Sequence, residues 1–321
     1  MLRLVIVAAL LACTAWLIRC LYKRRHIVTD EQPTVALATT NWPRAERHGT
    51  LPGDPRKIGP YKVVTRLGVG GMGIVFLVRG RNGKLFAVKM LLNTHDAEAA
   101  EELRSRFRRE MQVHASLPSS PYLVQVDTCQ FGERPWMAID FVDALSLQSF
   151  VAKRYPNGLP DDMLLTFFRG LVEALKQLHE HNIVHRDIKP SNILVPPTDG
   201  PKLIDLGIAR KTDGTRITGT NVIVGTPAYM APEHINHPQQ LSLAGDVFSL
   251  GAVICFGATG EPPFVGSSDG IILMNVVTAT PDLQRVPAFI RDIVAQCLHK
   301  EPANRPTAIE LREALARIAN A

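Results

Sequence analysis

Hydrophobic residues in the first half of the chain occur in short runs that suit β-strands. Three runs rich in β-branched and aromatic residues lie at 61–64, 74–78 and 85–90, separated by a glycine-rich turn and an Arg-Asn-Gly turn. Runs of this length between turn residues predict successive antiparallel strands. Two further strands are predicted at 123–129 and 136–141.

The segment 96–117 has a helical period instead. The residues that return to one face of this predicted helix are Leu103, Phe107, Glu110, Met111 and His114. Glu110 is the exception among apolar neighbours, and an unpaired carboxylate in such surroundings is costly to desolvate. We therefore expect a cation to pair with Glu110. Glu101 and Glu102 are the alternatives, but they do not share its placement.

The second half of the chain is mainly helical in pattern. Leucine and phenylalanine residues form a stripe along a predicted helix from 164 to 178. Small strands are predicted at 193–195 and 202–204. The segment 242–259 is apolar on nearly all sides, which predicts a buried central helix. A strand-rich part followed by a helix-rich part indicates an α+β fold with two lobes and a cleft between them.

The chain begins with an apolar run at 4–18, which is followed by the basic residues Arg19, Lys23, Arg24 and Arg25. The run with its flanks just reaches the ~20 residues that cross a bilayer. Basic residues after the run place the rest of the chain in the cytoplasm. We expect 1–25 to be a single-pass anchor in the cell membrane and 26–60 to be a poorly ordered juxtamembrane linker. A cleaved signal peptide is the alternative, since 10–13 loosely resembles a lipoprotein cleavage site.

The composition argues against a nucleic-acid partner and against a zinc site. Lys and Arg number 36 against 30 Asp and Glu, a net charge of +6. This excess is mild and lacks interleaved aromatic residues, so we expect no nucleic-acid partner. The five cysteines are odd in number, widely spaced and without a C-x-x-C pair. This pattern indicates reduced thiols in a cytosolic domain. No cysteine lies near a histidine in a spacing that would form a zinc site.

The segment 185–192 concentrates reactive side chains in the pattern H-R-D-x-K-x-x-N. Asp187 can accept a proton from a hydroxyl nucleophile. Lys189 can neutralise charge on a transferred phosphoryl group, and Asn192 can ligate a hard cation. A solvated surface loop is the alternative, but the complete octet is less expected by chance than any of its members.

A glycine-rich pattern, G-x-G-x-x-G-x-V, lies at 68–75. The same pattern marks dinucleotide-binding turns that lead from a strand into a helix. Here another strand follows, so we predict a hairpin whose bare backbone can lie over a polyphosphate. Lys89 ends the third predicted strand, from which its ammonium can reach the α- and β-phosphates. Asp205 follows a short strand and can bind Mg²⁺ together with Asn192.

In this order, the motifs resemble the protein kinase family over 61–319, with an N-lobe at 61–142 and a C-lobe at 143–319. The sequences at 70–73, 106–110 and 225–230 are most similar to those of bacterial, eukaryotic-like serine/threonine kinases. The resemblance implies a non-specific serine/threonine protein kinase that uses ATP and Mg²⁺, with Mn²⁺ as an alternative cation. The nucleotide-binding residues that it implies are Leu67, Gly68, Val69, Gly70, Gly71, Met72, Gly73, Ile74, Val75, Ala87, Lys89, Glu110, Ile139, Asp140 and Val142.

The resemblance also implies roles for the remaining motif residues. Asp187 is the expected catalytic base, Lys189 contacts the γ-phosphate, and Asn192 with Asp205 holds the metal. Ile139 lines the back of the adenine pocket beside a hinge at 140–142. The expected structural contacts are those of Asp246 with the backbone of the catalytic loop and of Glu233 with Arg305.

Regulation and partners are implied in the same way. Arg186 directly precedes the base, an arrangement associated with phosphorylation of the activation loop, here at Thr218 or Thr220. The expected partners are ATP, protein substrates and the membrane, and a homodimer of kinase domains is left open.

Two departures from the family pattern and two rival functions accompany this interpretation. Leu206 replaces the commoner Phe of the metal-binding tripeptide, and His114 stands where relatives often have an aliphatic residue. A pseudokinase is opposed by the presence of every residue needed for transfer. A small-molecule kinase is opposed by the segment 225–233, which resembles a peptide-docking loop.

Overall fold

The computed structural model describes residues 42–70, 73–92, 97–117, 119–132, 134–197, 200–207, 226–237 and 242–319. The predicted anchor at 1–25 and the first part of the predicted linker lie outside these residues. Among the helices that are described, none combines the length and the apolar character needed to cross a bilayer.

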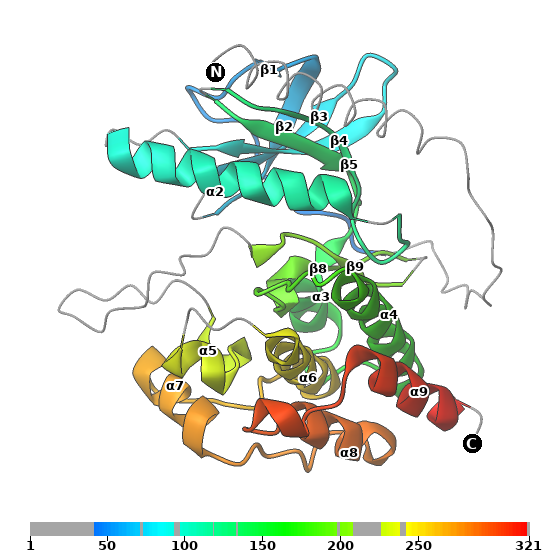
Figure 1. The fold of residues 1–321 in the computed structure, drawn as a ribbon. Coiled ribbons are helices and arrows are strands. Elements are labelled where there is room, and N and C mark those ends of the chain that lie inside the picture. The colour runs from blue at the N-terminus through cyan, green and yellow to red at the C-terminus, as the bar shows by residue number, and fades with distance from the viewer. Residues whose placement is uncertain are drawn as a thin grey trace. The chain divides into compact units, whose positions relative to one another are not determined.

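The N-terminal part of the fold is a six-stranded antiparallel sheet with the order β1-β2-β3-β4-β6-β5. Its strands are β1 (Lys57–Ile58), β2 (Tyr61–Val69), β3 (Gly73–Arg79), β4 (Leu85–Leu91), β5 (Val126–Gln130) and β6 (Trp136–Asp140). Helix α2 (Ala97–Ser116) lies along this sheet (Figure 1). Phe107 and Met111 of α2 are fully buried with Leu91 and Met137 of the sheet, as the helical period predicts.

The strand predicted at 123–129 starts later than expected, at Val126. Leu123 instead forms a parallel bridge with Leu203, and the N–H of Val124 donates to Leu203 O at 3.4 Å. Leu123 and Val124 are each about 4% exposed. They are therefore apolar because they are buried against β9 of the C-terminal part, and they are not part of the first sheet.

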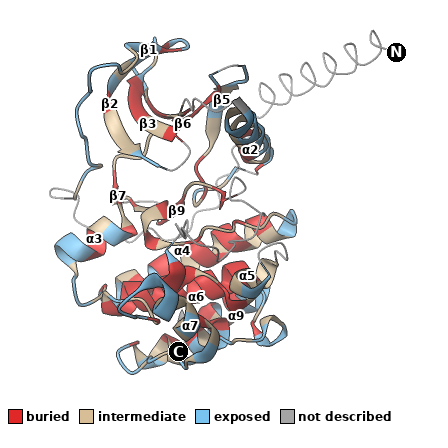
Figure 2. Cartoon of the chain, turned by 90° about the vertical axis from the view of Figure 1, so that its left-hand side faces the viewer, coloured by how far each residue is buried: buried red, intermediate tan, exposed pale blue. Residues whose placement is uncertain are grey.

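The C-terminal part is mainly helical. Its helices are α3 (Leu147–Arg154), α4 (Asp161–Glu180), α5 (Pro232–Asn236), α6 (Leu243–Thr259), α7 (Asp269–Thr278), α8 (Ala288–Cys297) and α9 (Ala308–Ala319), with short 3-10 turns at η3 (Pro190–Asn192), η5 (Pro227–Tyr229) and η6 (Pro302–Asn304). Figure 2 shows α4 and α6 largely in the buried colour. Every residue of α6 from 245 to 259 is buried, which confirms the predicted central helix.

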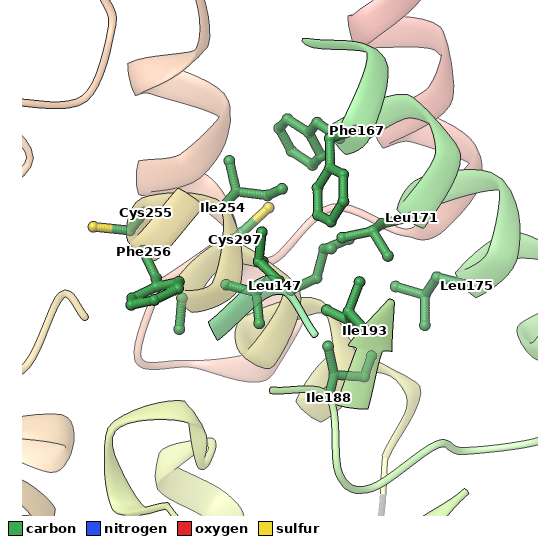
Figure 3. Close-up of a cluster of buried hydrophobic side chains, with 14 of the residues drawn as sticks. Leu147, Phe167, Leu171, Leu175, Ile188, Ile193, Ile254, Cys255, Phe256 and Cys297 are labelled. Atoms are coloured by element: carbon green, nitrogen blue, oxygen red, sulfur yellow. The ribbon is translucent and has the colours of Figure 1, made fainter. Parts of the chain in front are cut away.

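Helix α6 has a defined start and end. The Ser242 hydroxyl accepts from the N–H of Gly245, and the helix ends at Gly260, whose φ is 79°. A Cβ at position 260 would lie 2.0 Å from Pro156 O, so only glycine fits there. Figure 3 shows Ile254 of α6 in one cluster with Leu171 and Leu175 of α4. This core packs beneath the segment 185–192.

A small sheet, β7-β8-β9, fixes the segment 185–192. It comprises β7 (Leu145–Ser146), β8 (Ile193–Val195) and β9 (Lys202–Leu203), all antiparallel. Strand β8 begins directly after η3, and Ile188 and Ile193 are anchored in the main core (Figure 3). The polar residues between these two isoleucines are therefore held at the edge of a packed core.

Residues 42–60 are more structured than the predicted linker. They include β1, and the Trp42 ring stacks on Phe150 of α3 with ring centroids 5.0 Å apart. This part of the chain has no hydrophobic period, so its order comes from contacts with distant residues.

Candidate functional site

Lys89 connects three elements of the fold. Its Nζ lies 2.6 Å from Glu110 Oε1 on α2 and 3.1 Å from Asp205 Oδ1, which follows β9. The Glu110 side chain is 0% exposed. Glu101 and Glu102 instead pair with arginines on the outer face of α2. The structure thus brings Lys89 to the carboxylate that lies on the buried face.

The charges of this cluster stabilise one another. Burial alone would lower the pKa of Lys89, but Asp205 and Glu110 together raise it above its usual value. Burial raises the pKa of Glu110, and the Lys89 ammonium opposes that rise. Burial would also raise the pKa of Asp205, but the ammonium lowers it below its usual value. Lys89 is therefore a fixed cation beside two acidic side chains.

The side chains of the segment 185–192 converge on Asp187. Lys189 Nζ lies 2.9 Å from Asp187 Oδ2, and Asn192 Nδ2 donates to the same oxygen at 2.9 Å. Asn192 Nδ2 also donates to the Asp187 carbonyl at 2.9 Å. The carboxylate is therefore oriented by a cation and an amide from its own loop.

Asp246 of α6 holds the start of this loop. Its carboxylate accepts from the N–H of His185 at 2.7 Å and from the N–H of Arg186 at 2.9 Å, and it lies 3.3 Å from His179 Nε2. Arg186 has a φ of 71°, a strained value for a residue with a side chain. The two backbone N–H groups that donate to the buried Asp246 carboxylate stabilise this conformation.

The tripeptide 205–207 lies against the segment 185–192. The N–H of Ile204 donates to Asn192 O at 2.9 Å, and the N–H of Gly207 donates to His185 O at 2.7 Å. A Cβ at Gly207 would come within 2.8 Å of Asp187 Cβ. Glycine at this position therefore allows the backbone at 207 to pack directly on Asp187.

The glycine-rich pattern forms a hairpin, as predicted. Strands β2 and β3 are antiparallel, Val69 pairs with Ile74, and the N–H of Gly70 donates to Gly73 O at 2.8 Å. A Cβ at Gly73 would lie 2.4 Å from Met90 O, so this glycine packs directly on β4. Gly71 and Met72 lie outside the described residues.

The other predicted nucleotide-binding residues lie on adjacent strands. Val75 pairs with Lys89, and Ala87 pairs with Ile139. Asp140 ends β6, forms an ion pair of 2.6 Å with Lys84, and is followed two residues later by Val142. The remaining predicted residues belong to the β2–β3 hairpin described above: Leu67, Gly68, Val69, Gly70, Gly73 and Ile74.

Glu233 and Arg305 form a bidentate ion pair at 2.7 and 2.8 Å. The Arg305 side chain is 0% exposed, and its remaining donors reach the carbonyls of Ala244, His299 and Lys300. Burial would raise the pKa of Glu233, but the guanidinium lowers it below its usual value. The pair joins α5, α6 and the segment before α9.

The family model described as the protein kinase domain matches residues 61–315. The chain belongs to the protein kinase family.

Several bacterial kinases are similar to this chain. It is 40% identical to the serine/threonine-protein kinase AfsK of Streptomyces coelicolor over 265 residues, which cover 82% of this chain and 32% of AfsK. It is 40% identical to the probable serine/threonine-protein kinase PkwA of Thermomonospora curvata, covering 81% and 34% of the two chains. The crystal structure of the Mycobacterium tuberculosis PknI kinase domain matches with a TM-score of 0.61 at 26% identity, covering 82% of this chain and 97% of PknI. The kinase thus spans about a third of the length of AfsK and PkwA.

His114 occupies a position in this kinase domain that the sequence pattern could not interpret. The ring is about 5% exposed, and its Nε2 accepts from the backbone N–H of Leu206 at 3.4 Å. Burial lowers the pKa of His114 to about 4, and burial also lowers the pKa of His185. The neutral imidazole therefore contacts the tripeptide that carries Asp205.

Because the pKa values of the buried His114 and His185 are lowered, we expect the stability of this kinase fold to fall in acid. The pKa of His114 is about 6.5 when unfolded and about 4 when folded, so unfolding takes up a proton between these values. The free energy of unfolding should fall as the pH is lowered from 6.5 towards 4, by up to about 1.4 kcal/mol per pH unit for this group. Replacing His114 by Leu should make the fall shallower in urea unfolding measured from pH 7.5 to 4.5.

The matched control is the exposed His181, changed to Gln. This change should leave the pH dependence as it is in the unaltered chain. An equally steep fall for His114→Leu would show that other groups cause the acid sensitivity.

The kinase domain has oxygen donors that fit a magnesium ion. The carboxylate of Asp205 and the side-chain amide oxygen of Asn192 come from elements joined by the hydrogen bond between Ile204 and Asn192. Within the described part of the chain, no group of three or more His, Cys, Asp and Glu side chains could hold a metal ion. Magnesium typically takes one or two protein oxygens and completes its coordination with water and phosphate, so the donor set fits.

Proposed function

We propose that the chain is a serine/threonine protein kinase that transfers the γ-phosphoryl group of ATP to hydroxyl groups of proteins. The observation that carries this proposal is the convergence of Lys189 and Asn192 on the Asp187 carboxylate, at 2.9 Å each. Such a carboxylate is oriented to accept the proton of a substrate hydroxyl.

In the proposed reaction, Asp187 holds the substrate hydroxyl in line with the γ-phosphorus and receives its proton. The hydroxyl oxygen bonds to the γ-phosphorus as the bond from that phosphorus to the β–γ bridging oxygen breaks, and ADP leaves. Lys189 Nζ lies beside the carboxylate and would neutralise charge on the transferred group. The remaining work of the protein is positioning and charge neutralisation, because phosphoryl transfer through a loose transition state needs little covalent chemistry.

Asn192 and Asp205 would hold Mg²⁺, with Mn²⁺ as an alternative. The bound cation would supply charge neutralisation between the nucleotide phosphates. Lys89 would contact the α- and β-phosphates, since Glu110 fixes its ammonium from one side and Asp205 lies on the other. Glu110 acts here as a positioning residue.

The nucleotide would lie between the hairpin of 67–75 and β6. The paired residues Ala87 and Ile139 would contact the adenine, and the backbone of Asp140 to Val142 would form its hydrogen bonds. The hairpin supports this placement because its glycines leave the backbone uncovered by side chains.

Regulation and location complete the proposal. Phosphorylation at Thr218 or Thr220, both outside the described residues, would bring a phosphate to Arg186 and promote activity. Residues 1–25 would anchor the kinase in the cell membrane, with the kinase domain, within 61–319, in the cytoplasm.

The test is incubation of the chain with ATP labelled at the γ-phosphate, Mg²⁺ and a generic basic protein. We expect label on Ser and Thr of the substrate, and label on Thr218 or Thr220 of the kinase when its phosphopeptides are sequenced. Label on tyrosine alone, or on a small hydroxyl compound but no protein, would contradict the proposal. Nucleotide binding without any transfer would favour the pseudokinase.

A further inference from the structure

The segment 42–54, called the strap below, contacts both lobes of the kinase fold. It precedes β1, the first strand of the sheet, yet its first residue lies against the C-lobe. Nothing in the family motifs of 61–319 accounts for this segment. Besides an exposed ion pair of 2.6 Å between Glu46 and Lys153 of α3, its contacts with the lobes fall into three groups along its length.

The first contact anchors the strap on the C-lobe. The Trp42 ring stacks on Phe150 of α3 with centroids 5.0 Å apart and an interplanar angle of 28°. Trp42 Nε1 donates to the carbonyl of Val195, at the end of β8, at 2.8 Å. Phe150 is about 1% exposed, so the indole covers a fully buried ring.

The second contact lies next to the proposed hinge. The N–H of Ala45 donates to Asp143 Oδ1 at 3.0 Å, and Arg47 pairs with the same carboxylate at 3.4 Å. Asp143 directly follows the hinge residues 140–142. The side chains of Arg47 and Asp143 are 44% and 34% exposed, and exposed ion pairs contribute little, so the backbone hydrogen bond is the more important of the two.

The third contact ties the strap to the glycine-rich hairpin. The N–H of His48 donates to Arg66 O at 3.0 Å, and the N–H of Arg66 donates to Gly49 O at 3.1 Å. The Asp54 carboxylate accepts from Arg66 Nε at 2.8 and 2.9 Å and also pairs with its terminal nitrogen. The Asp54 side chain is only 5% exposed, and Arg66 directly precedes Leu67, the first of the predicted nucleotide-binding residues.

These contacts link the two walls of the proposed nucleotide site. The hairpin and the hinge belong to different parts of the chain, and the strap is held at Arg66 on one side and at Asp143 on the other. Trp42 fixes its far end to the C-lobe. Restricting the relative motion of two binding walls before the ligand arrives lowers the entropic cost of binding.

We propose that the strap is an interlobe brace that preorganises the hairpin and hinge for nucleotide, with Trp42 and Asp54 as its positioning residues. This inference rests on the proposed function, because it assigns the nucleotide to the hairpin and hinge. Loosening either end of the strap should weaken nucleotide binding, although neither side chain is among the proposed nucleotide contacts.

The test uses the full chain with Trp42→Ala, Trp42→Phe and Asp54→Asn. MgADP affinity is measured by calorimetry, and KM for ATP and kcat are measured with a basic protein substrate. We expect Trp42→Ala and Asp54→Asn to raise the Kd for MgADP and the KM for ATP about fivefold or more, with kcat within about twofold. Trp42→Phe should lie between Trp42→Ala and the unaltered chain, because it keeps the ring stacking and loses the Nε1 hydrogen bond.

Hydrogen exchange separates bracing from local support. Trp42 contacts Phe150 of α3 and Val195 of β8, both in the C-lobe. If Trp42 supported only these elements, Trp42→Ala would raise amide hydrogen exchange in α3 and β8 alone. We expect Trp42→Ala to raise exchange in 62–76 as well. Glu261→Gln, which removes an exposed ion pair with Arg285, should change neither exchange there nor affinity.

The outcomes distinguish the two proposals. A Kd for MgADP within about twofold of the unaltered value in both Trp42→Phe and Asp54→Asn, with unchanged exchange in 62–76, would overturn the brace. If Trp42→Ala does not fold, these two milder variants decide. A chain that binds MgADP but transfers no phosphate contradicts the proposed function and leaves the brace to be judged on affinity and exchange.

Discussion

Replacing Asp187 by Asn should lower kcat about a thousandfold, within the range that removal of a general base produces. The amide has nearly the same shape as the carboxylate, but it accepts a proton far less readily and loses the ion pair with Lys189. The Kd for MgADP should stay within about threefold, because Asp187 acts on the hydroxyl nucleophile and not on the nucleotide. Steady-state kinetics and calorimetry on the same preparation measure both quantities.

A chemically identical change at Asp292 is the control. Asp292 is exposed on α8, and Asp292→Asn should leave kcat and affinity unchanged. A kcat for Asp187→Asn within tenfold of the unaltered enzyme would remove this residue from the role of base. An equal loss of nucleotide affinity would place Asp187 among the binding residues instead.

Replacing Arg305 by Leu should lower the free energy of unfolding by about 3–5 kcal/mol, because it leaves the Glu233 carboxylate unpaired in a largely buried site. All five guanidinium donors have partners: one each from His299, Ala244 and Lys300, and two from Glu233. Arg305→Lys should be nearly as harmful, because an ammonium cannot reproduce the planar fork. Urea unfolding at neutral pH measures the change.

Arg285 offers the matched comparison. Its ion pair with Glu261 has a similar length, 3.1 Å, but the two side chains are 52% and 69% exposed. Arg285→Leu should therefore cost less than about 1 kcal/mol. Equal losses at the two arginines would mean that burial does not set the importance of these pairs.

Residues whose role depends on local pattern could be predicted from the sequence. The helical period placed Glu110 on a buried face, and Lys89 is the cation that meets it at 2.6 Å. The apolar character of 242–259 indicated the buried helix α6. In each case, the residue types and their spacing contain the physical cause of the structure.

Residues whose role depends on distant partners could not be predicted in this way. Leu123 has strand-like neighbours, but its bridge to Leu203 crosses 80 positions of sequence, the difference between the two residue numbers. Trp42 lies in a polar stretch without a period, and its position is fixed only by contacts with the distant residues Phe150 and Val195. A tryptophan in such a stretch is itself a signal, since a large aromatic side chain is rarely left in solvent.

The hydrophobic pattern of the C-terminal part also predicts a helix at α8 (Ala288–Cys297). Ile290, Val294 and Cys297 of α8 are all buried and recur at i, i+4 and i+7. This is the spacing of a helix face. Their apolar stripe indicates a helix as clearly as the stripe of α4 does.

The proposed phosphoryl transfer depends most on one arrangement, in which Asp187, Asn192 and Asp205 surround the terminal phosphate of ATP. A crystal structure with Mg²⁺ and a nonhydrolysable ATP analogue tests it directly. We expect oxygens of Asn192 and Asp205 at about 2.0–2.1 Å from a magnesium ion that also contacts the phosphates, with Asp187 facing the γ-phosphorus. A nucleotide bound elsewhere, or a metal held by other side chains, would contradict the proposed mechanism.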